Sequence, residues 1–270
     1  MRYREQQPTF VAPMLLTSGA VGGGETWTLE LKWDGCRGQL RYDRRTVSLR
    51  TRTGRECSAE FPELAAIAGV LGKHRVTLDG ELVCLRSDGR PDFARLRRRL
   101  SGRPRNPDPV ILQVFDVLHF DGCSTRALPY RERRALLEEL ALDGPAWRTP
   151  ASVVVNRAKD FVVRVAELGL EGVIAKRLDS TYIPGRRSTA RRKHKLRREE
   201  RLAVTGIRRT REGHVEAILV SRRQPDGSLS GAGSIGRGLR RERVERLEGA
   251  SRSSLCGEAV SSRSIRRRCR

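Results

Sequence analysis

The sequence predicts an α+β fold, in which a mixed sheet flanked by helices is followed by a smaller domain made of short strands. Three observations lead to this prediction. Between Thr26 and Leu196, short β-branched and apolar runs alternate with helix-like stretches, which is typical of a sheet covered by helices. Near Arg186 the composition shifts to a run rich in arginine and lysine. Beyond that run, three short strand-like segments follow one another.

Six segments of the first domain are predicted as strands, because β-branched and apolar residues dominate them or alternate with polar ones. They are Thr26–Lys32, Gln39–Tyr42, Val47–Arg52, Val76–Leu85, Val110–Leu118 and Gly172–Arg177. Pro62 and Pro129 suit the first turns of helices, and leucines repeat at helical spacing after Pro129. Ala158–Leu168 is predicted as a further helix, and the proline-rich stretch Gly102–Pro109 as a surface loop.

The basic run Arg186–Arg201 contains nine Arg or Lys residues and two acids, which predicts a phosphate-facing strand followed by a solvated hinge. Strands are predicted next, then a turn at 225–227 and a short helix at 240–248. The strands are Leu202–Ile207, His214–Ser221 and Leu229–Ile235. The last twenty residues contain six Ser and six Arg with almost no apolar periodicity, which predicts a disordered tail. We therefore expect domains at 1–198 and 199–250, and a tail at 251–270.

Charge and composition indicate the kind of partner. The net charge of +23 and the isoelectric point near 11.2 favour a polyanion, with nucleic acid as the first candidate. No apolar run approaches eighteen residues and no signal segment opens the chain, so we expect a soluble, cytoplasmic protein without a membrane partner. The six cysteines have no paired short spacing, so neither a zinc site nor a disulfide framework is predicted.

The segment TWTLELKWDGCRG carries the chemistry. Alternation along a strand places Glu30 and Lys32 on one face. The Asp34–Gly35 pair favours a tight turn that returns the chain, so that Arg37 approaches the same pocket. A lysine amine is a nucleophile only when neutral, and nearby cations favour that state. Taken alone, however, the K-x-D-G pattern is more often an ordinary amphipathic strand ending in a turn.

Further segments occur in a set order after this one. The strings LKWDGCR, RTRTG, LDGELV, VFDVLHFDG, EGVIAKR and RKHK resemble the ordered motifs of covalent nucleotidyltransferases, most closely those of bacterial ATP-dependent DNA ligases. The resemblance extends from about Thr26 to Leu196. It implies a nucleotidyltransferase (adenylation) domain with antiparallel and mixed sheets and flanking helices. The strands after it resemble the opening of an OB-fold barrel, and residues 199–250 are expected to form only part of that barrel.

The resemblance implies three steps: lysine attack on the α-phosphate of ATP, transfer of AMP to a DNA 5′-phosphate, and attack by the 3′-hydroxyl with release of AMP. Lys32 would carry the AMP and Glu30 would contact the adenine. Arg37 would contact the ribose and phosphate side, and Arg52 would help to hold the nucleotide or the 5′-phosphate. Phe115 would stack on the base, although on propensity alone it is equally typical of plain core.

The same resemblance implies a divalent metal, Mg²⁺ or Mn²⁺, coordinated by Glu81 and Glu171. Asp79 lies beside Glu81 in the sequence and is a candidate supporting partner. Taken singly, either glutamate is as well explained by a surface salt bridge.

Two lysines of RKHK complete the expected site. Lys193 and Lys195 share one face of an extended segment and would face the α-phosphate as its charge develops. Lys176 would also reach the nucleotide. The chain departs from the family pattern at Arg191, where an aromatic residue, usually Trp, is expected.

The function predicted from these residues is a monomeric ATP-dependent DNA ligase that seals nicked duplex DNA in repair, recombination or replication, associated with the nucleoid. One alternative is an RNA ligase or a capping nucleotidyltransferase. Another is a catalytically degenerate relative that binds nucleic acid, because the late basic motif of the OB domain is not found. The compositional change near Gly249 leads to the hypothesis of a truncated or frame-shifted end.

Overall fold

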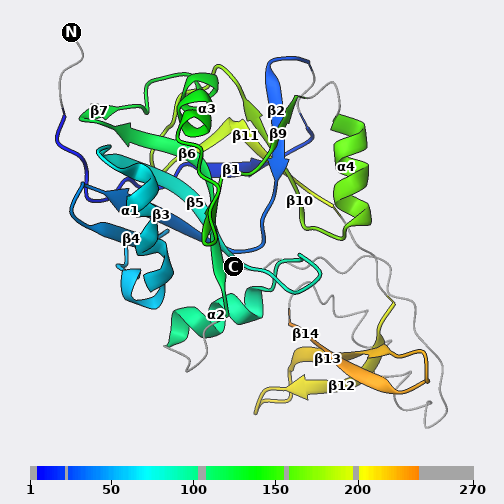
Figure 1. The fold of residues 1–270 in the computed structure, drawn as a ribbon. Coiled ribbons are helices and arrows are strands. Elements are labelled where there is room, and N and C mark those ends of the chain that lie inside the picture. Colours follow the sequence, from blue (N-terminus) through cyan, green and yellow to red (C-terminus); the bar gives the residue numbers. More distant parts are fainter. Residues whose placement is uncertain (1–4, 22–23, 103–107, 155–157, 197–200, 237–270) are drawn as a thin grey trace. The chain divides into compact units, whose positions relative to one another are not determined.

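The computed structural model describes residues 5–21, 24–102, 108–154, 158–196 and 201–236. The described chain divides into two compact units, with the boundary between Leu196 and Arg197. The first unit combines sheets with helices (Figure 1), which confirms the predicted α+β class.

One sheet of the first unit, sheet A, has five strands in the order β1-β11-β10-β2-β9. Strand β1 runs parallel to β11, whereas the other neighbours are antiparallel, so the sheet is mixed as predicted. Its strands are β1 (Leu15–Ser18), β2 (Trp27–Leu31), β9 (Ser152–Val154), β10 (Gly172–Arg177) and β11 (Arg187–Lys195). The basic run thus begins with a strand, and the hinge predicted after it falls largely on residues 197–200, outside the described residues.

The other sheet, sheet B, has the order β4-β3-β5-β6-β7, and β8 pairs in parallel with β6. Its strands are β3 (Cys36–Tyr42), β4 (Val47–Thr51), β5 (Val76–Cys84), β6 (Val110–Phe120), β7 (Cys123–Ser124) and β8 (Trp147–Arg148). Strand β6 is buried almost throughout. Side chains on both of its faces are therefore buried within the protein.

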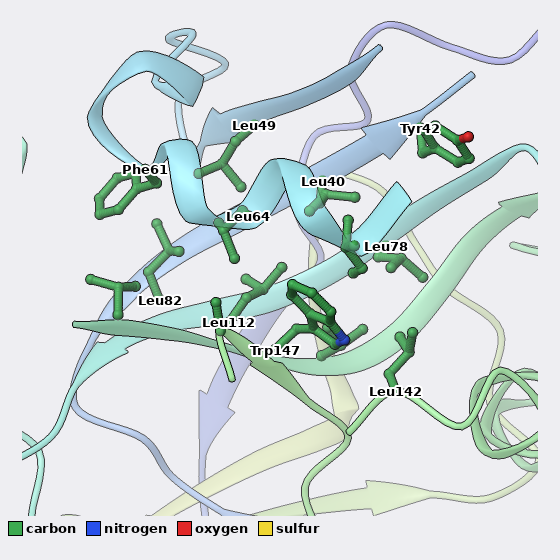
Figure 2. Close-up of a cluster of buried hydrophobic side chains, with 14 of the residues drawn as sticks. Leu40, Tyr42, Leu49, Phe61, Leu64, Leu78, Leu82, Leu112, Leu142 and Trp147 are labelled. Carbon is green, nitrogen blue, oxygen red and sulfur yellow. The ribbon is translucent and has the colours of Figure 1, made fainter. Parts of the chain in front are cut away.

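Helices cover both sheets. They are the 3-10 helices η1 (Ser58–Glu60) and η2 (Pro62–Ala66) and the α-helices α1 (Ile67–Leu71), α2 (Phe93–Ser101), α3 (Tyr130–Glu139) and α4 (Ala158–Glu167). Figure 2 shows the main core, where Phe61 and Leu64 lie against the leucines of β3, β5 and β6. Helix α4 packs on β10 of sheet A. Burial of these apolar faces is the principal stabilising contribution.

Helix α2 was not predicted, although the sequence carries a signal for it. The Asp92 carboxylate accepts hydrogen bonds from the backbone N–H groups of Ala94 (3.1 Å) and Arg95 (3.2 Å), which is the geometry of an N-cap. Leu96 is buried and Leu100 packs against the same core. An aspartate followed by apolar residues at helical spacing was therefore the missed start signal.

The two faces of β2 have separate roles. Trp27 and Leu29 pack with Val173 in a cluster of buried apolar side chains, whereas Glu30 on the opposite face is buried among polar groups. The chain then bends at Asp34–Gly35 and enters β3, which belongs to sheet B. The predicted tight turn that returns the chain is therefore wrong, because β2 and β3 lie in different sheets and do not pair.

The second unit is a three-stranded antiparallel sheet in the order β12-β13-β14. Its strands, β12 (Ala203–Arg209), β13 (Val215–Arg223) and β14 (Leu229–Ile235), correspond to the three predicted ones. The helix predicted at 240–248 and the tail at 251–270 lie outside the described residues. No helix in the described part of the chain is long and apolar enough to cross a membrane.

Candidate active site

Lys32 lies directly after β2, where its backbone N–H donates to the Gly172 carbonyl (2.9 Å). Its Nζ donates to Glu171 (2.6 Å), and Lys195 Nζ contacts the other oxygen of the same carboxylate (2.5 Å). Partial burial acts to raise the pKa of the Glu171 carboxyl, but the hydrogen bonds from Lys195 and Lys32 hold it below its usual value. Two lysines, from β11 and the end of β2, therefore converge on one carboxylate.

Lys193 adds a third cation beside this pair. It is two residues from Lys195 in β11, so both side chains lie on one face of the strand. Partial burial, together with the nearby charges of Lys195 and Lys32, lowers the pKa of the Lys193 ammonium. The cluster is thus strongly positive, which suits the binding of phosphates.

Arg37 and Glu81 face this cluster from sheet B, where they are paired neighbours on β3 and β5. Arg37 donates to both oxygens of Asp79 (2.6 Å each), and its guanidinium lies over the Phe115 ring (4.7 Å). Asp79 is completely buried. Asp79 therefore orients Arg37. From the sequence, Asp79 was expected as a supporting partner of Glu81 instead.

The Glu81 carboxyl has an unusual environment. Burial raises its pKa to about 7, although Arg37 and Lys32 act in the opposite direction, and Asp79 and Glu171 raise it further. No hydrogen bond from a described residue reaches this carboxylate. Strand β5 passes close to the bend at Asp34–Gly35, because a Cβ atom at Gly35 would lie 2.1 Å from the Leu82 carbonyl oxygen.

Glu30 lies in a buried ion pair. Lys176 Nζ donates to one of its oxygens (2.6 Å), and the Tyr130 hydroxyl donates to the other. Lys176 also lies over the Phe115 ring (4.6 Å). Burial lowers the pKa of Lys176 to about 8, with Glu30 acting against this shift. Both oxygens of Glu30 thus have partners within the protein.

The structure brings most of the predicted site residues near one another across the two sheets, through direct contacts or through the effects of their charges. They are Glu30, Lys32, Arg37, Glu81, Phe115, Glu171, Lys176, Lys193 and Lys195. Arg52 is the exception, because it lies in the exposed turn after β4. No contact among the described residues joins Arg52 to the others.

Comparison with known proteins agrees with this arrangement. Residues 16–195, which contain every contact of the site above, match the family model for the ATP dependent DNA ligase domain. The chain belongs to the ATP-dependent DNA ligase family. The match covers more than half of the chain and runs from within β1 to the end of β11.

Several relatives of this ligase chain are known. The multifunctional non-homologous end joining DNA repair protein LigD of Mycobacterium tuberculosis (strain H37Rv) is 38% identical over 243 residues, which is 88% of this chain and 31% of LigD. DNA ligase C2 of Mycolicibacterium smegmatis is 35% identical over 237 residues, covering 84% of this chain and 66% of that protein. The ligase chain therefore spans about a third of the length of the LigD relatives.

A solved structure has the same fold. The mycobacterial DNA ligase D complexed with ATP and MES is 36% identical and superimposes with a TM-score of 0.63, covering 89% of this chain and 77% of that one. The family uses ATP and a divalent metal. The ligase chain has residues that fit both: three clustered lysines for phosphates, and the carboxylates of Glu81 and Glu171 for a cation. A bound cation would favour the ionised form of the Glu81 carboxyl, whose pKa is raised by burial.

The set of carboxylates is small. The described part of the ligase chain contains no group of three or more His, Cys, Asp or Glu side chains suited to a metal ion. Mg²⁺ commonly uses one or two carboxylates and completes its coordination with water and substrate phosphates. Two glutamates are therefore sufficient, provided that a polyphosphate is present.

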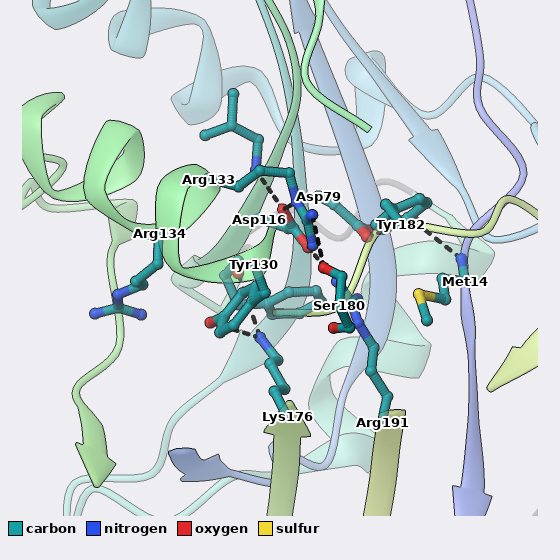
Figure 3. Close-up of polar contacts among 12 residues, drawn as sticks. Met14, Asp79, Asp116, Tyr130, Arg133, Arg134, Lys176, Ser180, Tyr182 and Arg191 are labelled. Atoms are coloured by element: carbon teal, nitrogen blue, oxygen red, sulfur yellow. Dashed lines mark hydrogen bonds and ion pairs between the residues drawn. The ribbon is translucent and has the colours of Figure 1, made fainter. Parts of the chain in front are cut away.

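Sequence reasoning missed a buried polar network beside the site (Figure 3). Asp116 follows Phe115 in β6 and is completely buried. Arg133 of α3 donates to both of its oxygens (2.7 and 3.2 Å). Arg191, the departure from the family pattern, is also buried and donates to Asp116. The position where the family pattern has an aromatic residue thus holds an arginine paired with a carboxylate. An acid and two distant arginines carry no local signal of such pairing.

Within this network, the largest loss of stability is expected from a substitution at Arg133. We expect Arg133→Met to lower the free energy of unfolding by about 3–5 kcal/mol, because it breaks a buried ion pair and frees the carbonyls of Leu128 and Ser180, to which Arg133 also donates. All three tryptophans lie in the first unit, so urea unfolding followed by tryptophan fluorescence measures the effect. Arg131→Met, an exposed neighbour on α3, should change little, within roughly 0.5 kcal/mol. Equal effects of the two substitutions would contradict the pairing.

The contribution of Glu81 to the free energy of unfolding is expected to depend on pH. Its pKa is about 7 in the folded chain against a usual 4.5, so between these values the folded state holds a proton that the unfolded state has released. The free energy of unfolding contributed by Glu81 therefore falls as pH rises from 4.5 to 7. We expect Glu81→Gln, in the presence of EDTA, to become more stable relative to the original chain at pH 8 than at pH 4.5. Thermal unfolding at both pH values measures this, with the exposed Glu167→Gln as control; a difference independent of pH would refute it.

Proposed function

We propose that this chain is the catalytic part of an enzyme that seals 5′-phosphate, 3′-hydroxyl nicks in duplex DNA with ATP, through AMP bound covalently to Lys32. The observation that supports this most directly is the convergence of Lys32, Glu171 and Lys195, which lie on three separate segments of the chain. A nucleophile, a carboxylate and phosphate-binding cations are the groups that this chemistry requires.

The lysine cluster supports the first step. In this proposal Lys32 Nζ attacks the α-phosphorus of ATP, the N–P bond forms, and the bond to pyrophosphate breaks. Lys193 and Lys195 stabilise the charge that develops on the α-phosphate oxygens, since fixed cations act strongly in a partly buried site. Glu171 orients the amine before nucleotide arrives.

The remaining roles concern the base and the sugar. Phe115 is proposed to stack on adenine, with Lys176 over the ring and Glu30 bound to Lys176. Arg37, oriented by Asp79, is proposed to contact the ribose and phosphate side. Arg52 is proposed to contact the 5′-phosphate, because its exposed turn is accessible to a large substrate.

A divalent cation, Mg²⁺ or Mn²⁺, is proposed to bind Glu81 and Glu171. When bound, it would offset the negative charge of the polyphosphate and stabilise the pyrophosphate leaving group. The Glu81 carboxyl supports this assignment, because burial raises its pKa despite the nearby charges of Arg37 and Lys32, and a bound cation would favour its ionised form.

The partner and the domain arrangement are part of the proposal. Residues 1–198 are proposed as the adenylation domain and residues 199–250 as a partial OB-fold domain, supported by the three antiparallel strands of the second unit. The net charge of +23 favours nicked duplex DNA as substrate, and hence a place at the nucleoid, with the protein acting as a monomer. Similarity to LigD favours a role in DNA repair.

One assay tests the proposal. The chain is incubated with α-labelled ATP and Mg²⁺, and then with a 5′-labelled nicked duplex. We expect a labelled protein adduct in the first stage and a sealed strand in the second. The absence of any adduct would overturn the proposal. An adduct without sealing would indicate a degenerate relative that binds nucleic acid, whereas sealing of nicked RNA alone or an adduct formed only with GTP would indicate an RNA ligase or a capping enzyme.

A further inference from the structure

Arg191 is a charged side chain buried within β11. It is 1% exposed, it donates to Asp116, and its guanidinium lies over the rings of Tyr182 (4.9 Å) and Tyr130 (5.8 Å). Its Nε is buried and has no hydrogen-bond partner among the residues that the structure describes. A buried cation is costly unless its partners are well placed, so these contacts define where the side chain can lie.

The anchor for Arg191 is a permanent anion next to the base platform. Asp116 directly follows Phe115 in β6 and is also held by Arg133. Although burial acts to raise it, the pKa of the Asp116 carboxyl is lowered to about 2 by Arg133 and Arg191. Asp116 therefore stays ionised across the physiological range, and the pairing with Arg191 persists.

Strand β11 connects this anchor to the phosphate-binding lysines. Side chains alternate between the two faces of a strand, so Arg191 shares its face with Lys193 and Lys195. Arg192, on the opposite face, lies over the ring of Trp27 (4.7 Å). A shift or rotation of β11 at Arg191 therefore moves both lysines relative to Phe115.

A second contact leads to Arg37. The Tyr182 hydroxyl, in the ring that Arg191 covers, donates to Asp79 (2.8 Å). Asp79 in turn holds Arg37 through two hydrogen bonds. Figure 3 shows Arg191, Tyr182 and Asp79 side by side. Arg191 thus touches the supports of both the base platform and the predicted ribose contact.

We infer that Arg191 is a positioning residue that holds β11, with Lys193 and Lys195, at a set distance from Phe115 of β6. This inference rests on the proposed function. Arg191 acts through Asp116 and Tyr182, and it does not contact the nucleotide itself. Its charge and its planar fork are both needed, because the contacts combine an ion pair with the faces of two aromatic rings.

The experiment compares Arg191→Met and Arg191→Lys with Arg164→Met, an exposed position on α4 (side chain 72% exposed). For each variant we measure the rate of lysyl-AMP formation as a function of ATP concentration, ATP binding by calorimetry, and thermal unfolding. We expect Arg191→Met to lower the maximal rate by roughly 10²-fold, the effect of a misplacement of about 1 Å. The rate for Arg191→Lys should lie between that of Arg191→Met and that of the unchanged chain, and Arg164→Met should match the latter.

The outcomes separate the two proposals. Cooperative unfolding of Arg191→Met together with an unchanged maximal rate would overturn the positioning role, because a purely structural residue changes stability alone. If Arg191→Met does not fold, an unchanged maximal rate in Arg191→Lys would have the same meaning. If the unchanged chain forms no adduct, the proposed function fails. In that case calorimetry still decides this inference: weaker ATP binding by Arg191→Met than by Arg164→Met supports it, and equal binding overturns it.

Discussion

Replacing Lys32 with alanine is expected to reduce the protein–AMP adduct to background, a loss on the order of 10³-fold or more. The amine is the proposed nucleophile, and its contact with Glu171 at 2.6 Å indicates a side chain held in one place before nucleotide binds. Gel electrophoresis after incubation with α-labelled ATP measures the adduct directly. The Lys32 and Glu171 side chains are largely buried (18% and 22% exposed), but Glu171 keeps Lys195 as a partner in the variant, so its carboxylate is not left unpaired and the loss of stability should be small.

The matched control is Lys159→Ala, an exposed lysine of α4 on the same unit, which should form adduct at the original rate. An adduct that persists in Lys32→Ala would assign the nucleophile elsewhere. Lys176 would be the next candidate, because burial lowers its pKa to about 8 and so favours a neutral amine. Digestion of the labelled protein with a protease and mapping of the labelled peptide would distinguish these positions.

Glu171→Gln is expected to slow lysyl-AMP formation by roughly 10²-fold. The substitution removes the charge that pairs with both Lys32 and Lys195, and it also removes one of the two carboxylates proposed for the cation. We therefore expect the Mg²⁺ concentration needed for half-maximal rate to rise as well. A titration of the rate against Mg²⁺ measures both effects.

Glu167→Gln, four residues earlier and exposed, serves as the control and should leave rate and Mg²⁺ dependence unchanged. An original rate for Glu171→Gln at every Mg²⁺ concentration would contradict its role. Full recovery at high Mg²⁺ would restrict that role to cation binding, whereas a rate that stays low would show that Glu171 also orients Lys32.

The parts of the site that could be predicted from sequence are those with local signals. Alternation along β2 placed Glu30 and Lys32 on one face, and the structure confirms that face, because Trp27 and Leu29 pack on the other side. The order of the motifs indicated that Phe115 and Lys195 belong to the same site, although they are distant in the chain. These predictions depend on short periodicities and ordered motifs, which a linear sequence retains.

The parts that were missed depend on contacts between distant segments. Asp34–Gly35 has the composition of a hairpin turn, yet the chain crosses there from one sheet to the other, because β2 pairs with β10 and β9 instead of β3. Likewise, Arg191 departs from the family pattern when read alone. Its pairing with Asp116 depends on the approach of β11 to β6, and no spacing within either segment indicates it.

The bridging of Lys32 and Lys195 by Glu171 has a consequence for how the protein is made. Strand β11 is the last strand of sheet A to be synthesised, and it completes the sheet between β1 and β10. Contacts between segments this distant in sequence form late in folding. A nascent chain that has left the ribosome only as far as Arg177 already carries Lys32 but lacks Lys195. Competence to react with ATP should therefore arise only when the whole first unit is complete.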